Sequence, residues 1–474
     1  MTLWKVMLLA GMVLAPAALA RAQQTDGQAS SQPADGRVTS QPAGALSAAP
    51  QDPPEHWNLY YQATSIGDAH GTFYAPYTGP MSLQAYPEHD VSLTTTLFFT
   101  ALLTTNTQLV FNPEVAGGKG LSGVAGIANS PNGEMPRVTT AMPKPYIARL
   151  FVSHDFAFGA DKEKVESDVN QLAGERPVTR YSIYAGGFAI TDYFDNNEYS
   201  HDPREQFMAW GVMYNGAWDY PADTRGYTWG LVQELHTRNW AFRYGIVAEP
   251  RVANGPQFDR RLFRDHGQVF EGERRFSLGD RDGTLRLLGY ANRADAGNYA
   301  AALRLAAATG DTPDVTATRR PGTLKYGVGV NLEQEVARDV GVFARLGWSD
   351  GKTEAFAFTA IDRLASAGVS VKGTRWKRKN DVVASSFTAS GISGVHALYL
   401  TRGGLDFIIG DGQLNYAPEY VWESYYSARV RPGLYATFDL QHDTNLAFNH
   451  DRGPVWIPAI RLHMEFGLKP RKAD

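Results

Sequence analysis

The segment PAIRLHMEFGL, residues 458–468, alternates between apolar and polar side chains along its length. A period of two residues is typical of a β-strand, because successive side chains of a strand point to opposite faces of the sheet. The expected strand therefore has one apolar face and one polar face that carries full charges. The apolar face consists of Ile460, Leu462, Met464 and Phe466, and the polar face of Arg461, His463 and Glu465.

The same alternation recurs in four further segments, at residues 240–249, 323–335, 341–348 and 434–441. Each expected strand is about 8–12 residues long, and clusters of Gly, Asn, Asp and Pro separate the strands from one another. A repeat of about ten alternating residues is typical of transmembrane β-barrels. The pattern therefore predicts an all-β, antiparallel fold.

A soluble β-sandwich also alternates and is the alternative to a barrel. Two features favour the barrel. Full charges recur on the polar faces, which suits a water-filled lumen, and the aromatic residues Trp229, Trp240 and Trp348 stand at the ends of apolar faces. Aromatic girdles of this kind flank the lipid-facing band of outer-membrane barrels.

Composition narrows the class of protein. The chain has no cysteine, so disulfides do not stabilise it, and its 47 glycines and 12% aromatic content suit a β-rich fold. A formal net charge of −4 makes nucleic acid an unsuitable partner. Beyond the N-terminus no apolar stretch approaches the roughly 18 residues of a transmembrane helix.

The N-terminal residues predict an export signal. Lys5 precedes an apolar run at residues 6–19, and Ala20 and Ala22 fit a cleavage site between small residues. We therefore expect a signal peptide at 1–22. Residues 23–54 are rich in Gln, Ser, Ala and Pro, and we expect a disordered linker there. The remaining residues, 55–474, have room for about 16 strands, and a barrel that wide leaves an aqueous channel.

Several segments, in this order, resemble the carbohydrate-selective porin family of Gram-negative outer membranes, the OprB-like porins. They are WNLYYQAT (57–64), YTGPMSL (77–83), NPEVAGGKGLSGVAGIANSPNGE (112–134), FDNNEYSHDPREQFMAW (194–210), AWDYPADTRGYTWGL (217–231), GDGQLNYAPEYVWESYY (410–426) and NLAFNHDRGPVWIPAIRLHMEF (445–466).

The resemblance implies a 16-stranded outer-membrane barrel that passes sugars by diffusion, past a constriction lined by charged and aromatic residues. It also implies contacts with outer-membrane lipids and lipopolysaccharide, and it leaves a homotrimer open. The chain departs from the family pattern at Gly187, where a basic residue is common, and near Leu446, where a proline is common.

The stretch DNNEYSHDPREQF, residues 195–207, concentrates acid, amide, imidazole and guanidinium groups. Its Asn and Asp residues suit turns, and Pro203 disfavours a strand interior. We interpret it as a loop whose shape is fixed by an ion pair of Arg204 with a carboxylate. A catalytic Ser200–His201–Asp202 set is disfavoured because neighbours in sequence do not form a triad, and the spacing matches neither an EF-hand nor a zinc pattern.

Two other motifs have structural interpretations. GKGLSG, residues 118–123, has the glycine spacing of a nucleotide-binding loop, but no helix pattern follows it, so we expect a loop folded inside the barrel. The basic run KGTRWKRKND, residues 372–381, is interpreted as a solvated loop or as a contact for lipopolysaccharide phosphates, with an anion or sugar funnel as a secondary alternative.

Charged residues on polar faces and in the 195–207 loop are the candidate sugar contacts. Sugars are neutral and rich in hydroxyls, so directional donors and acceptors beside aromatic faces suit them. Several shallow contacts allow release where one tight site would not. For each residue the alternative is a solvated or internally paired charge. The candidates are Glu114, Arg149, Asp195, Asp202, Arg204, Arg243, Arg286, Arg345, Asp439 and Arg461.

We therefore expect a porin for passive diffusion of monosaccharides and small oligosaccharides, with no catalytic residue, metal or cofactor. The first alternative is a general diffusion porin without sugar preference. A second is an enzyme on a barrel, which needs a convergent Ser/His/acid set on the outer wall. A third is a structural or secretion role in which the linker at 23–54 anchors a partner.

Overall fold

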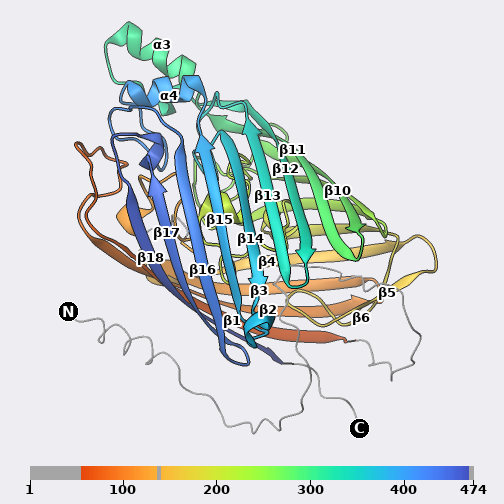
Figure 1. Cartoon of the computed structure of the whole chain (residues 1–474). Helices are drawn as coiled ribbons and strands as arrows, with labels where there is room; N and C mark the ends of the chain where they lie inside the picture. The colour runs from red at the N-terminus through yellow and green to blue at the C-terminus, as the bar shows by residue number, and fades with distance from the viewer. Residues whose placement is uncertain (1–54, 136–139, 469–474) are drawn as a thin grey trace. The chain divides into compact units, whose positions relative to one another are not determined.

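The computed structural model describes residues 55–135 and 140–468, all within one unit of the chain, Pro33–Asp474. Sixteen strands close into an antiparallel barrel, as the alternation predicts (Figure 1). Their bounds are β1 Trp57–His70, β2 Glu88–Thr104, β3 Thr107–Gly118, β4 Thr140–Ala157, β7 Arg180–Phe188, β8 Thr228–His236, β9 Trp240–Ala248, β10 His266–Leu278, β11 Arg281–Ala296, β12 Arg320–Ala337, β13 Val340–Ser349, β14 Arg363–Lys372, β15 Val382–Gly391, β16 Glu419–Arg431, β17 Leu434–Thr444 and β18 Val455–Leu468.

The remaining elements are short. A separate two-stranded sheet pairs β5 with β6, and helices occur only between strands in the described residues. None of the helices in this part of the chain is long and apolar enough to cross a membrane. The bounds are β5 Lys162–Val165, β6 Gly174–Pro177, α2 Trp210–Met213, α3 Tyr299–Thr309, α4 Gly394–Thr401, η1 Leu121–Gly123, η2 Ile190–Asp192, η3 Thr316–Thr318, η4 Gly373–Trp376 and η5 Leu446–Phe448.

Strand β1 closes the barrel because it pairs with both β2 and β18, so the strand that PAIRLHMEFGL predicts lies at the closure. One end of the barrel carries long connections that include α3 and α4, and the other end carries short turns such as residues 338–339 between β12 and β13 (Figure 1). In outer-membrane barrels the short turns face the periplasm and the long loops face the exterior.

The apolar strand faces point outward and the polar faces point into the barrel. On β18, Ile460 and Leu462 are 56% and 47% exposed, whereas Arg461 is 1% exposed. The same alternation holds on β9, where Trp240 is exposed and Arg243 is buried. An apolar outer band is what lipid requires, so the predicted sidedness is confirmed. The outer-facing tryptophans Trp229, Trp240 and Trp348 lie at or next to strand ends.

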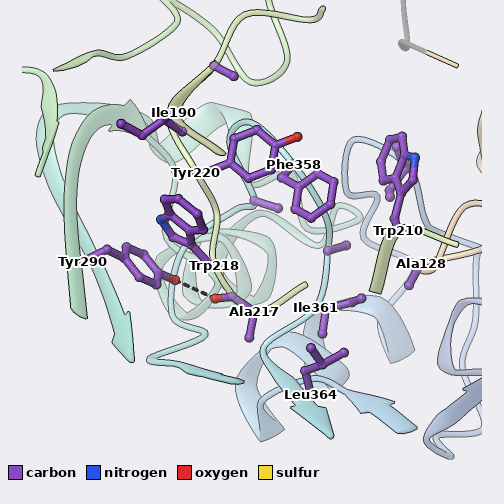
Figure 2. Close-up of a cluster of buried hydrophobic side chains, with 14 of the residues drawn as sticks. Ala128, Ile190, Trp210, Ala217, Trp218, Tyr220, Tyr290, Phe358, Ile361 and Leu364 are labelled. Atoms are coloured by element: carbon purple, nitrogen blue, oxygen red, sulfur yellow. Dashed lines mark hydrogen bonds between the residues drawn. The ribbon is translucent and has the colours of Figure 1, made fainter. Parts of the chain in front are cut away.

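The interior is more densely filled than the wide aqueous channel expected from strand number. Aromatic and aliphatic residues of the connections after β7 and β13 pack against inward side chains of the strands, and Figure 2 shows this cluster. Tyr290 of β11, for example, donates a hydrogen bond of 2.8 Å to the carbonyl of Ala217. Strand number fixes the diameter of the barrel, but it does not indicate which connections fold inward.

Other expectations depend on where segments lie. The signal peptide at 1–22 and the linker at 23–54 lie outside the described residues. Residues 118–123 form part of an inward loop with the buried residue Leu121, as expected. The basic run 372–381 lies at the short-turn end, away from the outer leaflet that holds lipopolysaccharide, so the structure favours a solvated turn.

The glycine at position 187 does not alter the lumen. Gly187 of β7 pairs with Trp229 of β8, whose side chain is on the outer face. A side-chain carbon at Gly187 would lie 3.0 Å from the ring of Trp229. The departure from the family pattern at this position therefore removes no charge from the interior of the barrel.

Candidate functional site

Residues 195–209, here named the crossing segment, run through the lumen between nearly opposite walls. At its start, the Asp195 carboxylate accepts hydrogen bonds from Arg345 of β13 at 3.2 Å and from Asn331 of β12 at 2.7 Å. Asp195 has a positive φ of 59°, a conformation that Asp and Asn tolerate better than most residues. This turn and its buried ion pair fix where the segment leaves the wall.

The other half of the crossing segment is held by β16 and β18. The Arg461 guanidinium donates to the carbonyls of Pro203, Glu205 and Gln206 at 2.6–2.7 Å. The Glu423 carboxylate accepts from the backbone amide of Ala209 at 3.1 Å. Buried charges of the wall therefore satisfy the backbone of a segment that has no sheet partners of its own.

Arg204 joins the crossing segment to β3. Its guanidinium lies 2.9 Å from Glu114 of β3 and 3.0 Å from Glu134 of the loop after β3. Between β12, which holds Asp195, and β3 there are eight strands in one direction and six in the other. The segment thus spans the lumen, and this ion pair is the one expected to fix the loop.

The electrostatics at Arg204 follow from burial and charge. Burial lowers the pKa of the Arg204 guanidinium, but the carboxylates of Glu134 and Glu114 outweigh burial and raise it well above its ordinary value. The pKa of Glu134 is raised, because burial outweighs the attraction of Arg204. Arg204 therefore stays charged. Glu134 takes up a proton more readily than an ordinary glutamate.

A β-bulge in β4 brings two further side chains to the same place. The register with β3 shifts between Asn112 and Pro113, so Tyr146 and Arg149 both reach the interior although they are three positions apart. Tyr146 donates to Glu114, and Arg149 donates to Asp192 at 2.7 Å. Tyr227, which precedes β8, donates to Glu114 at 3.0 Å and lies beside the ring of Tyr146.

A pocket of about 100 Å³ opens beside this cluster. One part of its wall is aromatic: Trp210 stacks on Phe358 with ring centres 5.3 Å apart, and Tyr220 lies 4.5 Å from Phe358 (Figure 2). The other part is polar and includes Asp223 and Arg225. This volume is below the ~300–1,000 Å³ that is typical of sites that enclose a ligand.

The Arg225 guanidinium is available for contacts. It lies over the ring of Tyr146, 4.1 Å from its centre, and no carboxylate of the described residues forms an ion pair with it. The pKa of the neighbouring Asp223 is raised by burial. Aromatic rings thus line the same pocket as an arginine and carboxyl groups, the combination that neutral, hydroxyl-rich molecules contact well.

The structure separates the ten predicted site residues into groups. Glu114, Arg149 and Arg204 meet at the pocket and its rim, and Asp202 accepts from the Arg204 backbone amide at 2.7 Å. Four other predicted residues are buried: Asp195, Arg345, Asp439 and Arg461. Of these, Asp195, Arg345 and Arg461 contact or form the crossing segment. Asp195, Arg345 and Arg461 thus act by holding the crossing segment, whereas Asp439 accepts a hydrogen bond from Gln441 of its own strand.

Arg243 and Arg286 form a ladder of charges on the inner wall. Arg243 pairs with Glu234, Glu271 and Glu273 at 2.6–2.9 Å, and Arg286 pairs with Glu273 at 3.0 Å. These two arginines lie apart from the pocket lining. Pocket residues that the sequence did not single out are Glu134, Tyr146, Trp210, Tyr220, Asp223, Arg225, Tyr227 and Phe358.

Other interpretations of residues 195–207 find little support in the geometry. The Ser200 hydroxyl donates a hydrogen bond to the carbonyl of Val212 at 2.6 Å and accepts one from Arg345. These bonds give the hydroxyl a structural role and not that of a nucleophile. The carboxylate of Asp195 accepts hydrogen bonds from Arg345 and Asn331, which leaves it poorly placed to bind a metal. Over the described ranges, one group of His and acidic residues has the spacing of metal ligands. It combines Glu205 of this stretch with His463 and Glu465 of β18.

Comparison with known proteins identifies the family of the chain. The model of the "Carbohydrate-selective porin, OprB family" matches residues 100–466, well over half of the sequence. The chain belongs to this family. Among curated proteins, no relative is detected.

Among the solved structures similar to this chain, one supports the fold. The high-pH structure of Pseudomonas putida OprB is similar to this porin with a TM-score of 0.64 and 15% identity, over 87% of this chain and 94% of that chain. The low-pH structure of the same protein has a TM-score of 0.44 and 11% identity, over 86% of this chain and 92% of that chain. Salmonella typhi OmpF, in complex with daunomycin, has a TM-score of 0.46 and 9% identity, over 87% of this chain and 98% of that chain.

Family and fold together define the class of molecule. This porin is a carbohydrate-selective outer-membrane β-barrel, and family and fold indicate a channel rather than an enzyme. The predicted family, the closed 16-stranded barrel and the carbohydrate porin function are confirmed.

Proposed function

We propose that this porin conducts monosaccharides such as glucose, and small oligosaccharides, passively past the crossing segment, and that the sugars contact the pocket beside Arg204. The observation that supports this is the pairing of an aromatic wall, Trp210 and Phe358, with a polar wall that includes Arg225. Aromatic faces pack on the C–H surfaces of sugars, while charged groups bind hydroxyls directionally.

The charge arrangement favours neutral solutes. Arg204 forms ion pairs with Glu114 and Glu134, and Arg149 forms one with Asp192, so most charge near the pocket is internally paired. Paired charges still offer hydrogen-bonding atoms, but they attract free ions weakly. Contacts of this kind are shallow enough for release, which a channel requires.

A general diffusion porin is the alternative, and liposome swelling distinguishes the two. Proteoliposomes that contain the full chain are diluted into isotonic glucose, a disaccharide, a larger oligosaccharide, or a neutral amino acid of glucose-like size. Our proposal predicts faster swelling in glucose than in the size-matched amino acid. Rates that follow molecular size alone would support the general porin instead.

The remaining assignments complete the proposal. Residues 1–22 act as the export signal, residues 23–54 as a linker, and 55–474 as the barrel domain. Lipids and the outer-leaflet lipopolysaccharide surround the apolar outer face, and a homotrimer stays a hypothesis. Deletion of 23–54 tests the rival anchoring role, because unchanged conductance and unchanged attachment to the cell wall would remove it.

A further inference from the structure

Three metal-binding side chains converge where the crossing segment meets β18. One ligand atom each from Glu205, His463 and Glu465 lies within 4.8 Å of the others. His463 and Glu465 are two residues apart on β18 and therefore share its inner face. Glu205 comes from the crossing segment, next to Arg204. Residues far apart in sequence thus present one imidazole and two carboxylates to one point.

The histidine is oriented as metal-binding histidines usually are. His463 is 1% exposed, and its Nδ1 lies 2.8 Å from the hydroxyl of Thr64 on β1. Its Nε2 is buried without a hydrogen-bond partner in the described part of the chain, and it lies 3.6 Å from Glu205 Oε1. A buried nitrogen left without a partner is costly, so its position facing two carboxylates calls for a ligand.

Arginines attract both carboxylates, but none lies within ion-pair distance of either among the described residues. Within the described residues, neither Glu205 nor Glu465 forms an ion pair with an arginine or a lysine. Arg461 directs its guanidinium at the backbone carbonyls of Pro203, Glu205 and Gln206, and Arg429 attracts Glu465 from outside ion-pair distance. Two carboxylates this close repel each other, and a bound cation would relieve that repulsion.

We propose that Glu205, His463 and Glu465 bind a divalent transition metal of the Zn²⁺ class, with water at the fourth position. An imidazole beside carboxylates suits Zn²⁺ better than Ca²⁺ or Mg²⁺, which prefer oxygen ligands. Tetrahedral coordination with bonds of about 2.0–2.1 Å places ligand atoms roughly 3.4 Å apart. The 3.6 Å between His463 and Glu205 is close to this value.

The site would connect the crossing segment to the barrel wall. Glu205 is the only one of the three ligands outside β18, and its neighbour Arg204 forms the ion pairs with β3. A bound metal therefore fixes the backbone from which Arg204 extends. Since the metal binds the folded protein, added Zn²⁺ is expected to raise the melting temperature of the porin.

Calorimetric titration of the metal-free, untagged full chain with Zn²⁺ tests the proposal, together with the visible spectrum after Co²⁺ is added. We expect one site per chain and a spectrum of tetrahedral Co²⁺. His463→Ala and Glu465→Gln should each weaken binding at least tenfold, and Thr64→Val, which removes the orienting hydroxyl, by about 10–100-fold. Strand content and thermal unfolding verify that each variant folds.

His154 provides the matched control. Its Nδ1 lies 2.8 Å from the hydroxyl of Thr107, as His463 lies from Thr64, but it is not part of the acidic cluster. His154→Ala should leave the affinity and the Zn²⁺-dependent melting shift unchanged. Absence of stoichiometric binding would overturn the proposal, as would binding that Glu465→Gln and Thr64→Val leave intact. If His463→Ala does not fold, the Zn²⁺ affinities of Glu465→Gln and Thr64→Val test the proposal.

Discussion

The Arg204 guanidinium lies 2.9 Å from the Glu114 carboxylate, and this contact joins the crossing segment to the wall strand β3. A second contact of 3.0 Å reaches Glu134. One positive charge thus pairs with two carboxylates inside the barrel. The ion selectivity of the pore should depend on this balance.

Replacement of Arg204 by glutamine should make the channel cation-selective. Without the guanidinium, the carboxylates of Glu114 and Glu134 stay in the passage uncompensated, and the loss of one member of such a buried pair costs about 3–5 kcal/mol of stability. The reversal potential in asymmetric KCl measures the selectivity. The Arg204→Gln and Glu114→Gln double variant should return part of the way to the original value, whereas an unchanged potential in the single variant would contradict this account.

Replacement of Phe358 by leucine should weaken sugar contacts and leave salt conductance nearly unchanged. Leucine keeps an apolar surface next to Trp210 but removes the aromatic face. An aromatic contact is worth about 0.5–1.5 kcal/mol, so glucose block should weaken roughly 2- to 10-fold. Trp229→Leu, on the outer face, is the control and should have no effect on block. Equal effects of both variants would argue against the pocket.

Replacement of Arg345 by methionine should loosen the crossing segment without opening the barrel. Arg345 is 0% exposed and binds Asp195 and the carbonyl of Val212. Its loss leaves buried acceptors unpaired, at a cost of about 3–5 kcal/mol. Hydrogen exchange should accelerate in residues 195–213 and stay slow in β12 and β13. The exposed Arg338→Met is the control, and unchanged protection of 195–213 in Arg345→Met would refute the holding role.

The loops at the long-connection end should loosen as pH rises. His396 of α4 lies 3.1 Å from both Asp362 and Asp406; the second contact is electrostatic, because the Nε2–H is not directed at the carboxylate. Burial lowers the pKa of His396, but the two carboxylates outweigh burial and raise it to about 9. The folded pKa exceeds the ordinary 6.5, so this stabilisation is complete below pH 6.5 and is lost as pH rises through about 9.

Hydrogen exchange of residues 394–401 measures this effect. Protection, corrected for the intrinsic pH dependence of exchange, should fall between pH 6.5 and 9.5 in the natural chain. In His396→Gln it should be lower at pH 6.5 and nearly independent of pH. A variant that shows the same pH-dependent loss would mean that another group titrates.

The sequence alone predicted the barrel because its signal is local. Each strand must present apolar side chains to lipid and polar ones to the interior, so PAIRLHMEFGL carries the sidedness of β18 within eleven residues. The filled interior was not predictable in this way. Whether the connection after β7 folds inward depends on distant partners such as Arg345 and Arg461, which the segment meets only in three dimensions.

The candidate site shows the same limit. Charge on a polar strand face predicted that Glu114 and Arg149 point inward, but it did not separate residues at the pocket from those that hold the crossing segment, such as Arg345. Trp210 and Phe358 come from connections without periodicity, so no pattern marked them. The bulge in β4 also brings in Tyr146, which strict alternation from Arg149 would place on the outer face.

The central claim is that sugars contact a defined surface inside this porin, and single-channel recording in a planar bilayer with increasing glucose tests it most directly. The account predicts open channels whose current falls saturably with glucose, and a block that Phe358→Leu weakens. Channels whose current changes only with the viscosity of the solution, equally in the natural chain and in Phe358→Leu, would contradict it.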